Sequence, residues 1–377
     1  MADNNENKVL NVPHLRFPEF SGEWKMATFG DIAKGFDYGM NAAAKSFDGN
    51  NKYIRITDID EVSSQYLYDD VVSPDGELED RYLVKENDIL LARTGASTGK
   101  SYLYRNSDGK LYFAGFLIRA NIYKHNSYFV FSQLHTLRYK KWISVMSARS
   151  GQPGINSQEY ASFPVYTTSL QEEDKIATFL KLLDERIITQ NKIIEKLQSL
   201  IKGLAAQLTQ SGTPNIRLCD CLECHSSTLL ENCVSVTGSY PVYGATGLIG
   251  YTNNYAYNGE SILIVKDGSG VGSLSYVNDH FSVIGTLNYL TAKENYSILY
   301  LYYALMAFNF TPYITGMAIP HIYFKDYGKA KLFYPSIEKR IRIASLLHNI
   351  EQKLVVEQNL VISLSTQKSY LLRMLFI

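Results

Sequence analysis

The stretch SLQEEDKIATFLKLLDERIITQNKIIEKLQSLIKGLAAQL, residues Ser169–Leu208, decides how the chain is organised, because the chain repeats it. The second copy, SIEKRIRIASLLHNIEQKLVVEQNLVISLSTQKSYLLRML, occupies Ser336–Leu375, at an offset of 336 − 169 = 167 without a gap. Within this alignment Ile176 falls on Ile343 and Leu180 falls on Leu347. The repeat predicts that the chain is built from two similar modules.

Both copies carry an apolar seam with alternating steps of four and three residues, which is the heptad pattern of a coiled coil. The first seam consists of Ile176, Leu180, Leu183, Ile187, Gln190, Ile194, Leu197, Ile201, Leu204 and Leu208. The second consists of Ile343, Leu347, Ile350, Leu354, Glu357, Val361, Leu364, Lys368, Leu371 and Leu375. Gln190 and Glu357 interrupt the seams at the same place, and such polar residues select one register at a cost in stability. We expect two helices of roughly 50 Å packed on each other, rather than helices buried in an ordinary core.

Composition bounds the class of protein. A chain of 377 residues with 46% hydrophobic content predicts two or more domains with real cores. The net charge is zero, so any nucleic-acid binding has to come from local patches rather than from an overall field. The four cysteines give no disulfide framework, and the polar opening MADNNENKVL is no signal peptide, so we expect a cytoplasmic protein. The uncharged segment 295–324 contains the apolar run Ile298–Phe310, which is shorter than a membrane span and predicts a buried helix.

The segments before the two long helices have a mixed pattern. Short apolar runs between turn residues predict strands, and longer runs predict helices. We expect strands at Tyr53–Thr57, Ile89–Arg93, Tyr112–Ile122, Ser261–Lys266 and Ser282–Leu290, and helices at Phe129–Val145 and Ser297–Phe308. The predicted fold class is therefore α+β, in the order globule, helix, globule, helix.

The repeat extends into the globules, with offsets that change as loop lengths differ. At offset 167, Pro153 meets Pro320 and Tyr160 meets Tyr327. NDILLARTGASTG (Asn87–Gly99) aligns with ESILIVKDGSGVG (Glu260–Gly272) at offset 173, and TFGDIAK (Thr28–Lys34) with RLCDCLE (Arg217–Glu223) at offset 189. Similar helices with dissimilar globules indicate two equivalent docking sites and two different targets.

This organisation resembles the specificity subunit of Type I restriction–modification enzymes, the HsdS family, over nearly the whole chain. The opening VPHLRFPEFSGEW, the turn and helix SGQPGINSQEYASFPVYTTSLQEEDKIATFLKLLDERI, and the segments PVYGATGLIGYTNNY and GESILIVKDGSGVG carry the resemblance. Their order across two halves is highly specific. The second turn departs from the first in having His321 in place of Gly154, which affects the role of that side chain.

The resemblance implies two target recognition domains separated by two long helices that pack as an antiparallel coiled coil. It divides the chain into an arm (1–22), recognition domain 1 (23–168), spacer helix 1 (169–211), recognition domain 2 (212–335) and spacer helix 2 (336–377). Each domain would read one half of a split site in double-stranded DNA. Half-sites on one face of B-DNA lie about 34–36 Å apart, which a rod of this length can span. Gln190 and Glu357 would then face each other near mid-length.

The resemblance also implies partners. Two modification subunits (HsdM, an adenine methyltransferase) would dock on the helical region, and two restriction subunits (HsdR) would complete the endonuclease. S-adenosylmethionine, ATP and Mg would be bound by these partners, and no cofactor by this chain. The sequence itself contains no adenine-methylation motif, no S-adenosylmethionine glycine loop and no helicase motif. We therefore expect a non-catalytic subunit that directs methylation and cleavage to DNA.

Base and phosphate contacts have to come from polar and basic residues on loops. In the first globule the candidates are Arg93, Ser97, Thr98, Lys100, Arg138, Lys140, Lys141, Arg149, Gln152 and Asn156. In the second globule they are Lys266, Asp267, Ser269, His321 and Lys325. For the glycine-rich loops, a hairpin turn inside the globule is an equally good interpretation. For the basic cluster of residues 138–141, a solvated helix end is the alternative.

Two other motifs compete with this interpretation. RTGASTGKS (Arg93–Ser101) resembles a phosphate-binding P-loop, but Thr94 stands where the first glycine is required, and Lys100 aligns with Ser273. A P-loop phosphotransferase therefore stays a weaker alternative, as does a DNA-binding scaffold of another defence system. Cys221, Cys224 and His225 suggest zinc, yet no second ligand pair follows at the usual spacing, so we expect no metal site.

Overall fold

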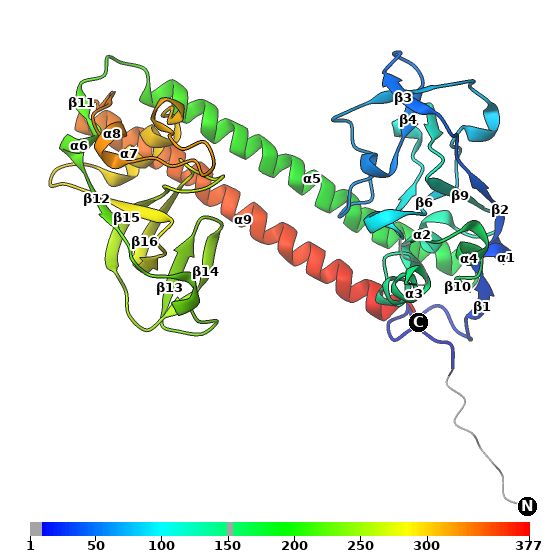
Figure 1. Cartoon of the computed structure of the whole chain (residues 1–377). Coiled ribbons are helices and arrows are strands. Elements are labelled where there is room, and N and C mark those ends of the chain that lie inside the picture. Colours follow the sequence, from blue (N-terminus) through cyan, green and yellow to red (C-terminus); the bar gives the residue numbers. More distant parts are fainter. Residues whose placement is uncertain (1–9, 149–153) are drawn as a thin grey trace, which may run out of the picture. The chain divides into compact units, whose positions relative to one another are not determined.

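The structure, a computed structural model, describes residues 10–148 and 154–377. The chain divides into two compact units, one ending at Gln190 and completed by Leu360–Ile377, the other formed by Asn191–Asn359. The long helices α5 (Leu170–Thr209) and α9 (Ile337–Leu375) each contribute one part to each unit (Figure 1). Each unit thus combines a strand-rich globule with parts of both helices.

Unit 1 is built on a four-stranded antiparallel sheet with the strand order β2-β9-β6-β7. Its strands are β1 (Lys25–Thr28), β2 (Ala33–Tyr38), β3 (Ala43–Ser46), β4 (Lys52–Ile54), β5 (Val72–Asp75), β6 (Asp88–Ala92), β7 (Ser101–Leu103), β8 (Leu111–Phe113), β9 (Leu117–Ile122) and β10 (Pro164–Thr167). Its helices are α1 (Phe29–Ile32), α2 (Ser127–Gln133), α3 (Leu137–Ser147) and α4 (Ser157–Ala161), with 3-10 turns η1 (Ile56–Asp58), η2 (Asp80–Tyr82), η3 (Gly95–Ser97) and η4 (Asn106–Asp108).

The central strand β6 is buried on both faces. Ile89 and Leu91 belong to the core that includes α2, α3 and the long helices, whereas Leu90 and Ala92 belong to a separate core on the opposite face. This alternation follows from the period of two in a strand. A sheet with a core on each face is therefore the rigid element that positions the loop after Ala92.

The expected strand Ile89–Arg93 is confirmed within one residue at each end, but the single helix expected over Phe129–Val145 is wrong. The chain breaks between α2 and α3, where the Thr136 hydroxyl accepts a hydrogen bond from Tyr139 N at 3.3 Å and caps α3. A capping threonine competes with helix continuation for the backbone. The expected strand Tyr112–Ile122 is likewise two strands, β8 and β9, separated by a short turn.

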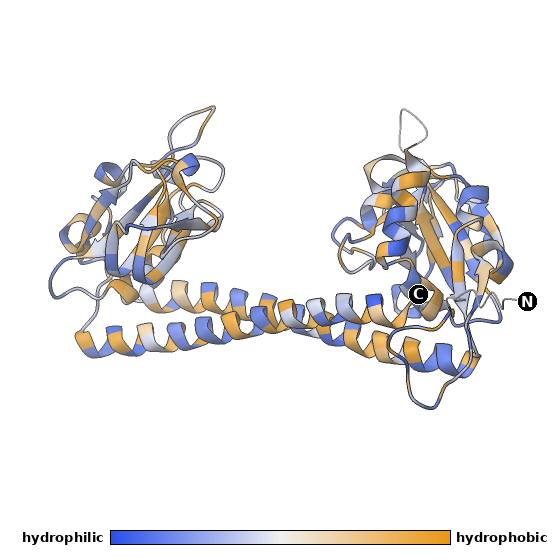
Figure 2. Ribbon diagram, turned by 90° about the horizontal axis from the view of Figure 1, so that it is seen from below, coloured by the Kyte–Doolittle hydropathy of each residue, from blue (hydrophilic) through white to orange (hydrophobic). Residues whose placement is uncertain are grey.

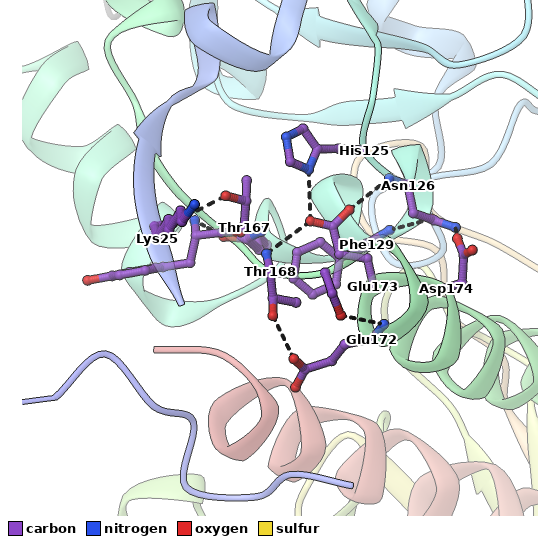
Figure 3. Close-up of polar contacts among 12 residues, drawn as sticks. Lys25, His125, Asn126, Phe129, Thr167, Thr168, Glu172, Glu173 and Asp174 are labelled. Atoms are coloured by element: carbon purple, nitrogen blue, oxygen red, sulfur yellow. Dashed lines mark hydrogen bonds and ion pairs between the residues drawn. The ribbon is translucent and has the colours of Figure 1, made fainter. Parts of the chain in front are cut away.

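Helix α5 starts at two buried carboxylates in its first turn (Figure 3). Glu173 accepts bonds from His125 Nδ1 at 2.8 Å, Asn126 N at 2.9 Å and Thr168 N at 3.1 Å. Glu172 pairs with Arg16 at 2.7 Å, which places the segment before β1 against the helix. Burial opposes ionisation of Glu172, but the bonds from Arg16 and Thr168 outweigh it, and the pKa of Glu172 is lowered. Negative charge at a helix N-terminus is stabilising, so this end of α5 is firmly placed.

Unit 2 contains a six-stranded sheet with the order β12-β17-β15-β16-β13-β14. The strands of unit 2 are β11 (Ile216–Arg217), β12 (Leu222–Ser226), β13 (Tyr240–Gly244), β14 (Gly247–Thr252), β15 (Tyr257–Val265), β16 (Leu274–Val283), β17 (Leu287–Ala292) and β18 (Lys331–Leu332), of which β11 and β18 form a separate two-stranded sheet. Its helices are α6 (Leu218–Cys221), α7 (Ile298–Met306) and α8 (Phe324–Tyr327), with 3-10 turns η5 (Glu231–Cys233) and η6 (Thr311–Tyr313).

Unit 2 repeats the plan of unit 1. Ile262 and Ile264 of β15 belong to the core shared with α7 and the long helices, and Leu263 and Val265 belong to a second core. Strand β15 is therefore the counterpart of β6. The helix α1 matches α6 at the expected offset of 189, since Phe29 falls on Leu218. The first short helix of each globule thus follows the sequence repeat.

The uncharged run expected to form a buried helix does so as α7, whose residues from Tyr300 to Leu305 are all buried. Within the described residues 10–148 and 154–377, no helix combines the length and apolarity required to cross a membrane. The expected strand Ser282–Leu290 is wrong as a single element, because the chain turns between β16 and β17.

The predicted seam is confirmed, since all ten of its positions in each long helix are buried or half-buried. In unit 1, Ile176 and Leu180 of α5 share a core with Leu371 and Leu375 of α9. In unit 2, Ala205 near the end of α5 shares a core with the start of α9. The start of one helix meets the end of the other in both units, so the helices run antiparallel. Figure 2 shows the matching alternation of apolar and polar positions along each helix.

The polar seam positions have individual surroundings. Gln190 and Glu357 are both buried, and Glu357 is paired with Lys353 one turn earlier on α9. Lys368 is a third polar seam residue, and it binds Asp184 of α5 at 2.6 Å. The register role of Gln190 and Glu357 stays a prediction.

Candidate nucleic-acid interface

The candidate interface of each unit is centred on the loop that follows the buried central strand, after β6 in unit 1 and after β15 in unit 2. Each loop is closed at its base by the same bond, from Gly99 N to Ala92 O at 3.1 Å in unit 1 and from Gly272 N to Val265 O at 2.8 Å in unit 2. Gly99 and Gly272 have φ of 91° and 85°, a conformation that glycine adopts without strain. Two different sequences therefore build one loop geometry.

A second segment lies against each loop. In unit 1, Ile155 N donates to Arg93 O at 2.9 Å, and Thr94 forms a bridge with Gly154. In unit 2, Ile322 N donates to Lys266 O at 3.0 Å, and Asp267 forms the equivalent bridge with His321. Thr94 matches Asp267 at the loop offset of 173, and Gly154 matches His321 at the offset of 167 for the second segment. Residues matched by two different offsets therefore make the same contact in both units. The structure brings together Arg93 with Asn156 in one unit, and Lys266 and Asp267 with His321 in the other.

Arg93 lies on an aromatic surface. Its guanidinium is 4.8 Å from the centre of the Tyr38 ring, and Tyr38 is 42% exposed. Tyr38 Oη accepts a bond from Ser157 N at 3.2 Å, and this bond lowers the pKa of Tyr38, with the charge of Arg93 acting in the same direction. A guanidinium held on a ring keeps its planar donors oriented, as bidentate contacts to guanine or phosphate require.

The other candidates of the first loop differ in accessibility. Ser97 and Thr98 are half-buried at the end of η3, where Thr98 Oγ1 donates to Gly95 O at 2.8 Å. Lys100 is directed into its own domain, with Nζ donating to Ile59 O at 2.8 Å and the side chain only 13% exposed. This arrangement favours a structural role for Lys100 over the predicted contact with DNA.

The basic cluster on α3 is similarly divided. Arg138 packs between the rings of Phe163 and Tyr166 and donates to Gln133 Oε1 at 3.1 Å. The side chain is half-buried, and burial lowers the pKa of Arg138. These contacts inside the domain favour a structural role for Arg138 over the predicted contact with phosphates. Lys140 and Lys141 are exposed and suited to phosphate contacts.

Three candidates belong to the segment before α4. Arg149 and Gln152 lie outside the described residues. Asn156 caps α4, since its Oδ1 accepts from Glu159 N at 2.9 Å while Asn156 N donates to Glu159 Oε2 at 2.9 Å. The capping box gives Asn156 a structural role at the start of α4. Its side chain is also exposed, so it remains accessible to a ligand.

In unit 2 the candidates lie beside a hairpin whose ends, Thr315 and His321, exchange backbone bonds of 2.9 and 2.8 Å. The His321 ring contacts Tyr323 with centroids 5.0 Å apart, and Lys325 Nζ lies 5.1 Å from the centre of the same ring. Ser269 and Lys325 are exposed, and Lys266 and Asp267 are half-buried. The arrangement is a cation and aromatic surface next to a polar loop.

Exposed apolar residues at these loops were missed by reasoning based on polar side chains. They are Phe116 and Tyr38 in unit 1 and Met317, Ile319 and Tyr323 in unit 2. The signal available in the sequence was the run Gly316–Pro320, a turn sequence with aliphatic residues and no charge. Such residues have no core to fill at a hairpin tip, so they belong to the candidate surface.

The competing motifs are not supported. A P-loop places a helix N-terminus at the phosphate, but the three-residue strand β7 follows the glycine loop, and its lysine is engaged by Ile59. Among the described residues, no three or more His, Cys, Asp or Glu form a group that could hold a metal ion, and the expectation of no metal site stays a prediction. Cys221 is in the core, and burial raises the pKa of its thiol to about 12.

The geometry defines a class of protein. It is an internally duplicated α+β chain in which two globules present equivalent loops with different side chains and share a pair of antiparallel helices. The model of the Type I restriction modification DNA specificity domain matches residues 21–199 and 216–364, one copy in each half of the chain. The chain therefore belongs to this family.

Curated relatives are similar over parts of their length. The specificity subunit of the EcoprrI Type I restriction enzyme of Escherichia coli is 28% identical over 112 residues, which are 30% of this chain and 28% of that protein. The MjaVIII specificity subunit of Methanocaldococcus jannaschii is 25% identical over 215 residues, 55% of this chain and 46% of that protein. The chain thus matches less than half the length of each of these two relatives.

A solved structure has a similar fold. The Type I restriction–modification S subunit of M. genitalium superposes with a TM-score of 0.70 at 16% identity, covering 97% of this chain and 99% of that one. At this identity the comparison shows the fold alone. It agrees with the expected arrangement of two strand-rich domains and two long helices.

Proposed function

We propose that this chain is the DNA-reading subunit of a Type I restriction–modification enzyme and recognises a target in two parts. The observation that carries the proposal is the twin loop contact, Thr94 with Gly154 and Asp267 with His321. Its backbone geometry is the same in both units, while its side chains differ. Two loops with the same backbone geometry but different side-chain donors and acceptors would allow the two domains to read two different half-sites.

We further propose that α5 and α9 act as a spacer between the two readers. In support, each helix is unbroken, with 40 and 39 residues, so each is about 60 Å long at 1.5 Å per residue. Both helices also enter the core of each unit, so each globule is attached to the helix pair by buried packing rather than by a flexible linker.

The proposed partners are two modification subunits docked on the helical region and two restriction subunits. Support comes from large apolar side chains that α5 and α9 expose, among them Leu182, Ile341, Val356 and Ile362. Large apolar side chains left exposed on a helix are available for contacts with another protein. S-adenosylmethionine, ATP and Mg would be bound by the partners, and methylation and cleavage would be their chemistry.

The test is methylation in a host that lacks other adenine methylation. The chain is expressed together with its modification subunit, and methylated adenines are mapped across the genome. The proposal predicts methylation at one sequence made of two defined parts with an undefined spacer of fixed length. Methylation that does not depend on this chain, or that occurs at one uninterrupted sequence, would contradict it.

A further inference from the structure

Two carboxylates at matching positions of the long helices bind tyrosines of the globules. Asp184 of α5 accepts a hydrogen bond from Tyr128 Oη of α2 at 2.5 Å. Glu351 of α9 accepts bonds from Tyr302 Oη at 2.8 Å and Tyr303 Oη at 2.7 Å, both from α7. The offset 351 − 184 = 167 is that of the helix repeat. We call these contacts the unit 1 clamp (Tyr128, Asp184, Lys368) and the unit 2 clamp (Tyr302, Tyr303, Glu351).

The tyrosines do not occupy matching positions. When α2 and α7 are aligned on their N-caps, Asn126 and Ser297, the offset is 297 − 126 = 171. Tyr128 then matches Leu299, while Tyr302 and Tyr303 match Phe131 and Ser132. In each unit a tyrosine hydroxyl therefore donates to the carboxylate at the matching position of the long helix, but the tyrosines stand at different positions of α2 and α7. Because the tyrosines do not match in the repeat while the carboxylates do, the hydrogen bond to the carboxylate points to a functional requirement rather than to a chance pair.

The clamps consist of strong hydrogen bonds. Burial and the neighbouring carboxylate raise the pKa of Tyr128, Tyr302 and Tyr303 far above the ordinary value for tyrosine, so the hydroxyls remain donors at neutral pH. Bonds from a hydroxyl to a carboxylate are among the stronger ones in proteins. In unit 1, Lys368 of α9 binds the same carboxylate at 2.6 Å, so Asp184 joins the globule to both long helices. The position matching Lys368 is the buried Ile201, and in unit 2 a second tyrosine hydroxyl takes the place of the lysine.

Beside the packed core of unit 1, a surface groove separates part of the globule from α5. This groove has a volume of about 620 Å³ and is lined, among others, by Asn87, Arg105, Tyr128 and Asp184. Side chains that do not fill the space between two elements do not oppose small rotations of one on the other. The bond between Tyr128 and Asp184 crosses this boundary and opposes such a rotation.

We propose that Asp184 and Glu351 are positioning residues that fix the angle of each recognition domain on the helix pair and so limit the half-site spacings that the protein accepts. The inference rests on the proposed function. One added base pair shifts a half-site by about 3.4 Å and rotates it by roughly 35°. A domain held at one angle rejects that shift, whereas a domain that swings on its helix accepts it.

The experiment uses the full chain in complex with its modification subunit. Initial methylation rates are measured on DNA with the native spacer and with spacers one base pair longer or shorter. Tyr128→Phe and the double variant Tyr302→Phe/Tyr303→Phe remove only hydroxyl groups, and Asp184→Asn and Glu351→Gln test the acceptors. Loss of a bond to a charged group corresponds to about tenfold or more in an equilibrium. The spacer preference is the initial methylation rate on DNA with the native spacer divided by the rate on DNA with an altered spacer. This ratio should therefore fall about tenfold in each clamp variant.

Tyr102→Phe is the matched control, because Tyr102 Oη donates to Asp108 Oδ2 at 2.6 Å entirely inside the unit 1 globule. It should lower stability without changing spacer preference. Clamp variants whose spacer preference equals that of the wild type, at whatever overall rate, would overturn the inference while leaving the proposed function intact. A wild-type complex that methylates no split site would overturn both.

Discussion

Arg93 and Lys266 occupy the same place in the two units but present different donors. Each carbonyl accepts the bond that joins the loop to the second segment, so the backbone at both residues is fixed. The side chains are then the variable part, a planar guanidinium held on Tyr38 in one unit and an ammonium in the other. Arginine and lysine differ in how they recognise bases and phosphates, so under the proposed function the two loops would read different half-sites.

At this scale, Arg93→Ala or Lys266→Ala in the complex should weaken binding to the cognate DNA by roughly tenfold to a hundredfold if the side chain contacts a base. If the side chain contacts a phosphate, the slope of log affinity against log salt should fall by about one. Binding titrations at several salt concentrations measure both quantities.

Lys100→Met is the control for this prediction, because Lys100 binds Ile59 O inside its domain and methionine keeps the aliphatic stem. Its salt slope should equal that of the wild type. A reduced slope for Lys100→Met together with unchanged slopes for Arg93→Ala and Lys266→Ala would reverse the assignment of the contacts.

The candidate residues could be predicted from the sequence only as a set. Glycine-rich loops after apolar strands are local signals, and they placed Arg93 and Lys266 at the junction of strand and loop, where each directly follows the last residue of its strand. The partners of Lys100 and Arg138 depend on tertiary contacts, with Ile59 lying 41 residues away in the chain and Tyr166 packing on Arg138. Neither contact can be inferred from the neighbouring sequence, so the engaged side chains of Lys100 and Arg138 could not be distinguished from exposed ones such as Lys140.

At the scale of elements, the heptad identified α5 and α9 because its period is a local property repeated over forty residues. The break between α2 and α3 was not identified, since it depends on the competition of one threonine side chain with helix continuation. The clamps were not identified either. Tyr128 and Asp184 are 56 residues apart, and nothing in the spacing of either residue indicates the other.

The seam predicts the effect of truncating its apolar residues. Leu180 and Leu347 match in the repeat and are 1% and 0% exposed. Leu180→Ala and Leu347→Ala should each lower the free energy of unfolding by about 2–5 kcal/mol, because each leaves a cavity in a packed core. Denaturant unfolding of the isolated chain measures this loss.

Leu182→Ala is the control on the same helix, since Leu182 is 61% exposed. Its effect on the isolated chain should stay within about 0.5 kcal/mol. A loss as large as that of Leu180→Ala would show that the seam does not carry the helix packing.

At the scale of the whole molecule, the repeat makes each unit a self-contained combination of one globule with parts of both helices. The central strands, the twin loops and the clamps recur in both units although the globules differ in sequence. A modular chain of this kind should allow one recognition domain to be replaced without altering what the other reads.

The most direct test of this account is therefore a domain exchange. Residues 23–168 are replaced by the corresponding domain of another family member, and methylated sites are mapped in cells that also express the modification subunit. The account predicts that one half of the recognised sequence changes, while the other half and the spacer stay the same. A change in both halves, or in neither, would contradict it.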